Sequence, residues 1–101
     1  MKLRFFVAAR RELLESALYL EQQEPGLGER FLDDVERALA LIRKHPQAWN
    51  PIGPGLRRCR LVVFQYGLIY RIRNETIEIV AVAPDSRRPG YWQARLKRDR
   101  Q

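Results

Sequence analysis

The sequence has a single cysteine, Cys59, and a single histidine, His45. One cysteine excludes an internal disulfide and a cysteine metal cluster, and with one histidine no zinc site built from protein ligands is expected. We therefore expect neither a metal ion nor a cofactor. Cys59 stands between Arg58 and Arg60, and two interpretations stay open. The arginines could lower the pKa of the thiol and make it a nucleophile, or the thiol could be a small side chain packed under a sheet.

Long apolar runs are also missing. No stretch approaches the roughly 18 apolar residues of a membrane-spanning helix. The apolar run at residues 5–9 is too short for a signal peptide, and Arg10, Arg11 and Glu12 follow it directly. No linker and no repeat divides the 101 residues, so the sequence predicts one domain over residues 1–101. We expect a cytoplasmic protein without a membrane segment.

Acidic side chains are scarce in the second half of the chain. The net charge is +7, yet residues 1–56 carry eight basic and eight acidic side chains, which cancel. Residues 57–101 carry eleven basic and only four acidic side chains, so the whole excess lies there. A one-sided positive field attracts an anionic partner, which is either nucleic acid or an acidic protein segment.

The first half of the sequence predicts a short strand and two helices. Apart from Arg4, residues 3–7 are apolar or aromatic, which favours a strand. Apolar residues then recur at helical spacing over residues 8–23. A Pro-Gly turn ends this helix, and a second helix begins near Leu27, with Arg43 and Lys44 in its last turn, where cations suit the helix dipole. Because the turn is so short, the two helices are expected to run antiparallel.

The second half predicts a sheet. Residues 45–55 hold three prolines and two glycines and are expected to be irregular. Strand candidates follow at residues 56–64, 66–73 and 76–83, with separators so short that the strands should form an antiparallel meander. Both alternating sets of the last strand are mainly apolar, so both of its faces should be covered. With a final helix over residues 91–98, the chain is expected to fold as a two-layer α+β domain.

Arginines and large aromatic residues gather in and just beyond the predicted strands. Side chains alternate along a strand, so two arginines share one face of each of the first two strands of the meander. If the register brings these pairs together, they form one cationic surface suited to phosphate or carboxylate, which the segment after the last strand would extend. The aromatic rings there could stack on bases or on a peptide, or could clamp the last helix onto the core. The candidate binding residues are Arg58, Arg60, Arg71, Arg73, Arg87, Arg88, Tyr91 and Trp92.

Candidate groups for acid and base catalysis are few. A metal-independent ribonuclease needs a general acid and a general base beside the scissile phosphate, in addition to cations. The three lysines lie outside the predicted strands, and His45 adjoins a helix end, where a histidine complements the dipole. Tyr91, Asp85 and Glu78 remain as possible proton-transfer groups, but no motif supports them. Binding is therefore favoured over catalysis.

Four stretches of the sequence stand out together: PGLGERF at the start of the second helix, HPQAW after its end, YGLIYRI in a strand and RRPGYW near the C-terminus. In order and spacing they resemble the RelE/ParE superfamily of toxins from bacterial type II toxin–antitoxin systems. The resemblance covers residues 1 to about 96. It implies an N-terminal strand, an antiparallel helical hairpin packed on a curved antiparallel sheet, and a short C-terminal helix. As a partner it implies an antitoxin whose C-terminal segment wraps the toxin.

The resemblance also implies two alternative activities. RelE-like members are metal-independent ribonucleases that cut messenger RNA in the ribosome, using sheet arginines and lysines and a C-terminal tyrosine or histidine. ParE-like members lack that catalytic set and poison DNA gyrase. Pro84 stands where many relatives have histidine, and the sheet contains no lysine. Carried over by position, the catalytic candidates of a nuclease would be Arg71, Arg87 or Arg88, and Tyr91.

These departures favour the ParE-like branch, which is not a nuclease. The sequence therefore predicts a toxin that inhibits growth by binding an essential target, expected to be DNA gyrase, and that a cognate antitoxin neutralises. The alternative is a RelE-like, ribosome-dependent endoribonuclease acting on messenger RNA. A third possibility is a degenerate family member that is harmless to the cell and is kept as a binding partner.

Overall fold

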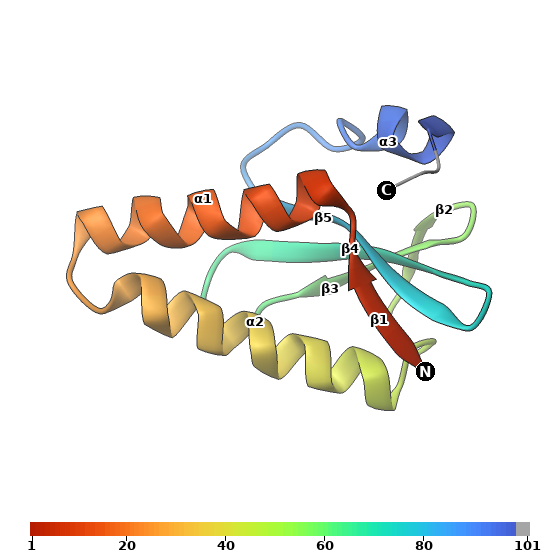
Figure 1. Cartoon of the computed structure of the whole chain (residues 1–101), viewed down its shortest axis with the longest axis horizontal. Helices are drawn as coiled ribbons and strands as arrows, with labels where there is room; N and C mark the ends of the chain where they lie inside the picture. Colours follow the sequence, from red (N-terminus) through yellow and green to blue (C-terminus); the bar gives the residue numbers. More distant parts are fainter. Residues whose placement is uncertain (99–101) are drawn as a thin grey trace.

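The computed structural model describes residues 1–98, which form an α+β fold with two long helices on one face of a five-stranded sheet (Figure 1). A short helix near the C-terminus lies beside the first turns of the first long helix. The fold class predicted from the sequence is confirmed. In chain order the elements are β1 (Lys2–Phe5), α1 (Val7–Gln23), α2 (Leu27–Lys44), β2 (Pro51–Gly53), β3 (Leu56–Arg60), β4 (Tyr66–Arg73), β5 (Thr76–Pro84) and α3 (Gln93–Arg98).

The sheet is mixed, with the strand order β1-β5-β4-β3-β2. β3, β4 and β5 form the antiparallel meander expected from their short connections. β1 runs parallel to β5, which corrects the expectation of a wholly antiparallel sheet. The hairpin of α1 and α2 lies between these two strands in the chain, and a parallel pair requires a long crossover of this kind.

A short edge strand lies in the proline-rich segment 45–55, which the sequence predicted to be irregular. Pro51–Gly53 forms β2 and pairs antiparallel with the start of β3. Proline cannot donate a ladder hydrogen bond, so such a strand is confined to the edge of a sheet, where only one side needs partners. β3 itself ends at Arg60, four residues earlier than predicted for the strand at residues 56–64.

A buried carboxylate holds the connection between β3 and β4. Asp34 of α2 is 1% exposed and accepts hydrogen bonds from the backbone N–H groups of Val62 (3.4 Å), Val63 (2.8 Å) and Phe64 (3.0 Å). The carboxylate thus satisfies backbone donors that a continuing strand would have paired. The loop presents Val62 and Val63 to solvent, while the Phe64 ring packs edge-on against Phe31 with centroids 5.4 Å apart.

The two helices of the hairpin approach closely at a glycine. Both helices begin and end within one residue of the predicted positions. A Cβ added at Gly28 would lie 2.5 Å from the carbonyl oxygen of Ala17, so a larger residue would force the helices apart. The Glu21 carboxylate accepts the N–H groups of Gly26 and Gly28 at 2.9 and 3.0 Å and so satisfies free donors at the start of α2. No helix in residues 1–98 is long and apolar enough to cross a membrane.

Side chains complete the hydrogen bonding of β5 where β1 ends. The parallel pairing stops at Phe5, so the later residues of β5 have no strand on that side. The Val82 N–H instead donates to Oε1 of Glu12 on α1 at 3.0 Å, and the Val80 carbonyl accepts a hydrogen bond from Arg95 on α3 at 2.9 Å. The strand is buried along almost its whole length, as its apolar pattern predicted. Both charged side chains therefore lie at the margin of the core.

Candidate functional site

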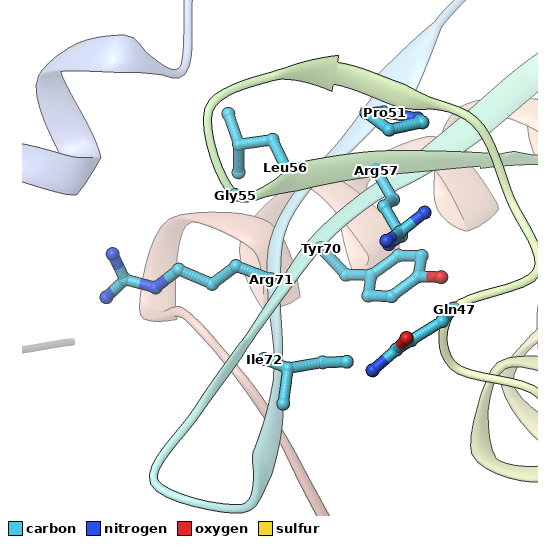
Figure 2. Close-up of a pocket in the computed structure, with 8 residues that line it drawn as sticks. All are labelled: Gln47, Pro51, Gly55, Leu56, Arg57, Tyr70, Arg71 and Ile72. Atoms are coloured by element: carbon cyan, nitrogen blue, oxygen red, sulfur yellow. The ribbon is translucent and has the colours of Figure 1, made fainter.

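The register brings the predicted arginines of the sheet onto one face. Arg58 lies opposite Ile69 in the pairing of β3 with β4. Steps of two residues from this pair reach Arg60 on β3 and Arg71 and Arg73 on β4, and residues two apart in a strand share a face. Figure 2 shows the Arg71 side chain extending away from the other β4 side chains drawn there. We call the surface formed by these four arginines the arginine face.

A buried carboxylate engages one arginine of this face. Glu78 on β5 is 6% exposed and lies between β1 and β4 in the sheet. Nη2 of Arg4 and Nε of Arg71 donate hydrogen bonds to its two oxygens, each at 2.6 Å. Both guanidinium groups also lie near the Phe6 ring, at 5.5 and 5.3 Å from its centroid. Arg71 is therefore held inside the protein. Its partner Glu78 was considered in the sequence analysis only as a proton-transfer group, and Phe6 was not singled out.

The arginines of β3 are more accessible to an external anion than Arg71 is. The stem of Arg58 lies over Gly67, where an added Cβ would come within 3.2 Å of the arginine Cγ. Arg58 is half-buried and makes no ion pair with any residue in the described range 1–98. Arg60 is exposed and lies 3.4 Å from a carboxylate oxygen of Asp85, and Arg73 is exposed at the end of β4. An external anion would meet these three side chains before it met Arg71.

The segment that follows β5 is built around two aromatic rings. Trp92 is 3% exposed and belongs to the core, and the Tyr91 ring meets it edge-on with centroids 5.2 Å apart. The Arg87 guanidinium lies 3.6 Å from the centroid of the Tyr91 ring, which is a cation–π contact. Arg88 is exposed. The two rings thus fix the start of α3 on the sheet, while the two arginines stay at the surface.

Glu12 and Arg95, which the sequence analysis did not single out, hold this segment against α1. Nη1 and Nη2 of Arg95 donate to the two oxygens of Glu12 at 3.0 and 2.7 Å, and Arg87 approaches the same carboxylate at 3.8 Å. The hydrogen bond to Glu12 raises the pKa of the Arg95 guanidinium. A weak sequence signal existed, since Glu12 adjoins Ala9 and Leu13 on the buried side of α1, where a charge needs a partner.

Two of the three groups considered for proton transfer are buried: the Glu78 carboxylate and the Tyr91 hydroxyl; Asp85 is exposed and pairs with Arg60. The Tyr91 hydroxyl and Trp92 Nε1 are buried without a well-formed hydrogen bond to any described residue. Burial, and then the adjacent Glu12 carboxylate, raise the pKa of the Tyr91 phenol. Within residues 1–98 no group of His, Cys, Asp and Glu side chains is arranged to hold a metal ion. The arrangement suits binding through guanidinium groups better than acid and base catalysis.

Cys59 is a core side chain. It is 2% exposed on β3, and burial raises the pKa of its thiol to about 11. The neighbouring arginines do not activate it, because their side chains leave the opposite face of the strand. The interpretation of Cys59 as a nucleophile is therefore wrong, and the alternative of a small packed side chain is correct.

We expect the native chain to resist alkylation at Cys59. A thiol pKa of about 11 leaves about a hundredth of the thiolate that an ordinary thiol provides near pH 8, and burial blocks the reagent further. Iodoacetamide labelling followed by mass spectrometry should therefore be at least about a hundredfold slower in the folded chain than in the chain unfolded by guanidinium chloride. The double variant Cys59→Ala/Val63→Cys places a thiol on an exposed position and should react readily. Comparable rates for this variant and the native chain would contradict the assignment.

Two comparisons place the chain among known proteins. The family model described as ParE toxin of type II toxin-antitoxin system, parDE, matches residues 3–89. A chain in the solved structure of the chromosomal ParDE TA system from P. aeruginosa aligns with a TM-score of 0.74. The two chains are 16% identical, and the alignment covers 83% of this chain and 95% of that chain, so this likeness shows the fold alone. A comparison with curated proteins finds no significant match.

Proposed function

The chain belongs to the ParE toxin family of type II toxin–antitoxin systems, and we propose that it stops growth by binding an essential target, DNA gyrase. A cognate antitoxin would neutralise it by covering cationic residues of the toxin. The protein would act in the cytoplasm and would need no cofactor. The observation that supports binding over RNA cleavage is that the Arg71 guanidinium binds Glu78 and that the Tyr91 hydroxyl is buried.

Both residues lack the freedom that a metal-independent ribonuclease requires. Such an enzyme places cations and a proton acceptor beside the scissile phosphate. Arg71 binds the buried Glu78, and turning it toward RNA would strip that carboxylate of a partner at a high cost in free energy. The raised pKa of Tyr91 keeps the phenol protonated, so it is a poor general base at neutral pH. These contacts support the ParE-like activity over the RelE-like alternative.

We assign the contact with antitoxin and target to arginines whose guanidinium groups stay at the surface. An acidic protein segment is the partner chemistry that the charge of +7 favours. We propose a supporting role for Arg71, Tyr91 and Trp92, because internal contacts hold each of them. They would position the surface without contacting the partner directly. The residues proposed to contact a partner directly are Arg58, Arg60, Arg73, Arg87 and Arg88.

Expression in a bacterial host is expected to arrest growth and to induce the DNA-damage response without transcript cleavage. The purified protein should inhibit supercoiling by gyrase. Arg58→Gln should raise the half-inhibitory concentration about tenfold, since losing one charge-assisted contact costs about 1.4 kcal/mol. Arg43→Gln removes an exposed arginine at the end of α2 and serves as the matched control.

Two other outcomes would overturn this proposal. Transcripts cut at the ribosome, with gyrase fully active, would assign the RelE-like ribonuclease activity instead. Normal growth together with unaffected supercoiling would indicate a degenerate toxin that still binds its partner.

A further inference from the structure

A pocket of about 240 Å³ lies between the β2–β3 turn and the segment that follows α2. In Figure 2 the Arg71 guanidinium extends away from this pocket, on the other side of β4. The pocket therefore does not belong to the arginine face. Arg71 still lines the pocket, although its guanidinium binds Glu78. The other lining residues are Gln47, Pro51, Gly55, Leu56, Arg57, Tyr70 and Ile72.

Arg57 supplies the charge of the pocket. Its Nη1 donates to the Trp49 carbonyl oxygen at 2.5 Å, which fixes the guanidinium while leaving its other N–H groups for a ligand. In Figure 2 the guanidinium points toward the Tyr70 ring, and the Gln47 carboxamide lies beyond that ring. No acidic residue lines the pocket, and Arg57 makes no ion pair within the described residues 1–98. A fixed guanidinium without a carboxylate partner is a preformed anion site.

Apolar walls restrict the anion that fits. Leu56, Ile72 and the ring of Tyr70 present hydrocarbon to the pocket. The Tyr70 hydroxyl donates to the Pro46 carbonyl at 2.6 Å, so it is already used, and burial raises its pKa to about 12, so it adds no negative charge. A doubly charged phosphate would meet the guanidinium of Arg57 alone, because that of Arg71 is paired with Glu78, and the remaining walls are largely apolar. A carboxylate on a short aliphatic stem can instead bind Arg57 while its methylene groups contact the walls.

We propose that this pocket binds the side-chain carboxylate of a glutamate from a partner polypeptide. The carboxylate oxygens accept hydrogen bonds from Arg57, and the exposed Gln47 carboxamide at the rim offers a further donor. Pro46 and Pro51 stiffen the two segments that form the walls, so little ordering is needed on binding. This contact goes beyond the proposed toxin function, because it involves the opposite side of β4 and requires no particular target.

The test titrates N-acetyl-glutamic acid α-amide into the isotope-labelled full chain at neutral pH and follows backbone amide chemical shifts by NMR. Saturable shifts are expected at Leu56, Arg57 and Ile72, with a Kd of about 1–10 mM, the range for a small ligand held mainly by one ion pair. The matched neutral probe, N-acetyl-glutamine α-amide, has nearly the same shape. It should bind at least about tenfold more weakly, because it lacks the charge.

Variants of the chain localise the effect. Arg57→Gln should weaken binding of the glutamate probe at least about tenfold. Arg37→Gln causes the same loss of charge on the exposed side of α2, outside the pocket, and should leave the Kd unchanged. Arg57→Lys keeps the charge but loses the planar fork, so it should bind with intermediate affinity. It also provides a folded comparison if Arg57→Gln proves unstable in a thermal melt.

Several results would overturn the assignment. Equal affinity for the two probes, or wild-type affinity in both Arg57 variants, would remove the role of the guanidinium. Inorganic phosphate that saturates the same amides at a lower concentration would replace a carboxylate by a phosphate site. Shifts confined to the arginine face would locate the anion elsewhere. None of these results would affect the gyrase assay, which tests the toxin function separately.

Discussion

Replacing Glu12 with alanine is expected to lower the free energy of unfolding by about 3 to 4 kcal/mol, as when one partner of a buried ion pair is removed. The substitution leaves Arg95, whose side chain is 18% exposed, without its carboxylate. It also leaves the Val82 N–H without an acceptor at the open side of β5. Val82 is 1% exposed and the Arg95 side chain is largely covered, so water replaces the lost contacts poorly. Urea unfolding followed by circular dichroism measures the loss.

Two matched variants distinguish the effect of losing the Glu12–Arg95 ion pair from the effect of replacing any glutamate on α1. Glu15→Ala removes a carboxylate from the exposed side of α1 and should change stability by less than about 0.5 kcal/mol. Glu12→Gln keeps an acceptor for the Val82 N–H but loses the charge opposite Arg95. Its loss in free energy of unfolding should therefore lie between those of Glu15→Ala and Glu12→Ala. Hydrogen exchange should show α3 losing protection first. A loss below about 1 kcal/mol for Glu12→Ala would mean that the Glu12–Arg95 pair contributes no more to stability than an exposed salt bridge.

The second large effect is expected for Asp34→Ala, at about 3 kcal/mol. Three backbone N–H groups lose the acceptor they share, and each unsatisfied buried donor costs about 1–3 kcal/mol. Water recovers part of this cost, because the side chains of Val62 and Val63 are already exposed. The free energy of unfolding from urea titrations measures the change, and hydrogen exchange at Val63 and Phe64 should accelerate while β4 stays protected.

Asp33 provides the control for this prediction, because it carries the same charge on the exposed side of α2. Asp33→Ala should leave both stability and amide exchange nearly unchanged. Asp34→Asn keeps one acceptor oxygen and should retain part of the protection. Unchanged exchange at Val63 and Phe64 in Asp34→Ala would mean that the loop holds its conformation without the carboxylate.

Local signals were sufficient to predict the hairpin and the meander. Helical periodicity and the Pro-Gly turn placed α1 and α2, and short separators required β3, β4 and β5 to be antiparallel. Local signals could not predict the direction of β1 relative to β5, because residues 2–5 contain no information on which distant strand they pair with or in which direction. β2 was missed for a related reason. Its proline excludes it from the middle of a sheet, and a position at the edge is not a local property.

The sequence predicted where the arginines of the sheet point, but not which of them are engaged. Alternation placed Arg58, Arg60, Arg71 and Arg73 on one face once the register was known. Glu78 is seven residues from Arg71 but on another strand, and Glu12 is 83 residues from Arg95, so a count of charges along the sequence does not pair them. Tertiary contacts alone show that two acidic residues each face two guanidinium groups: Glu78 with Arg4 and Arg71, and Glu12 with Arg87 and Arg95.

The parallel pairing of β1 with β5 has a consequence for how the toxin is made. Arg4 and Glu78, which join these strands, are 74 positions apart in the chain. Contacts of such long sequence separation form late, because the intervening loop must first be closed at a cost in entropy. β1 is synthesised first but can pair only when β5 exists, so a nascent polypeptide holds an unpaired strand until the meander is complete. The complete five-stranded sheet is therefore expected only in molecules whose synthesis has passed β5, and never in shorter nascent chains.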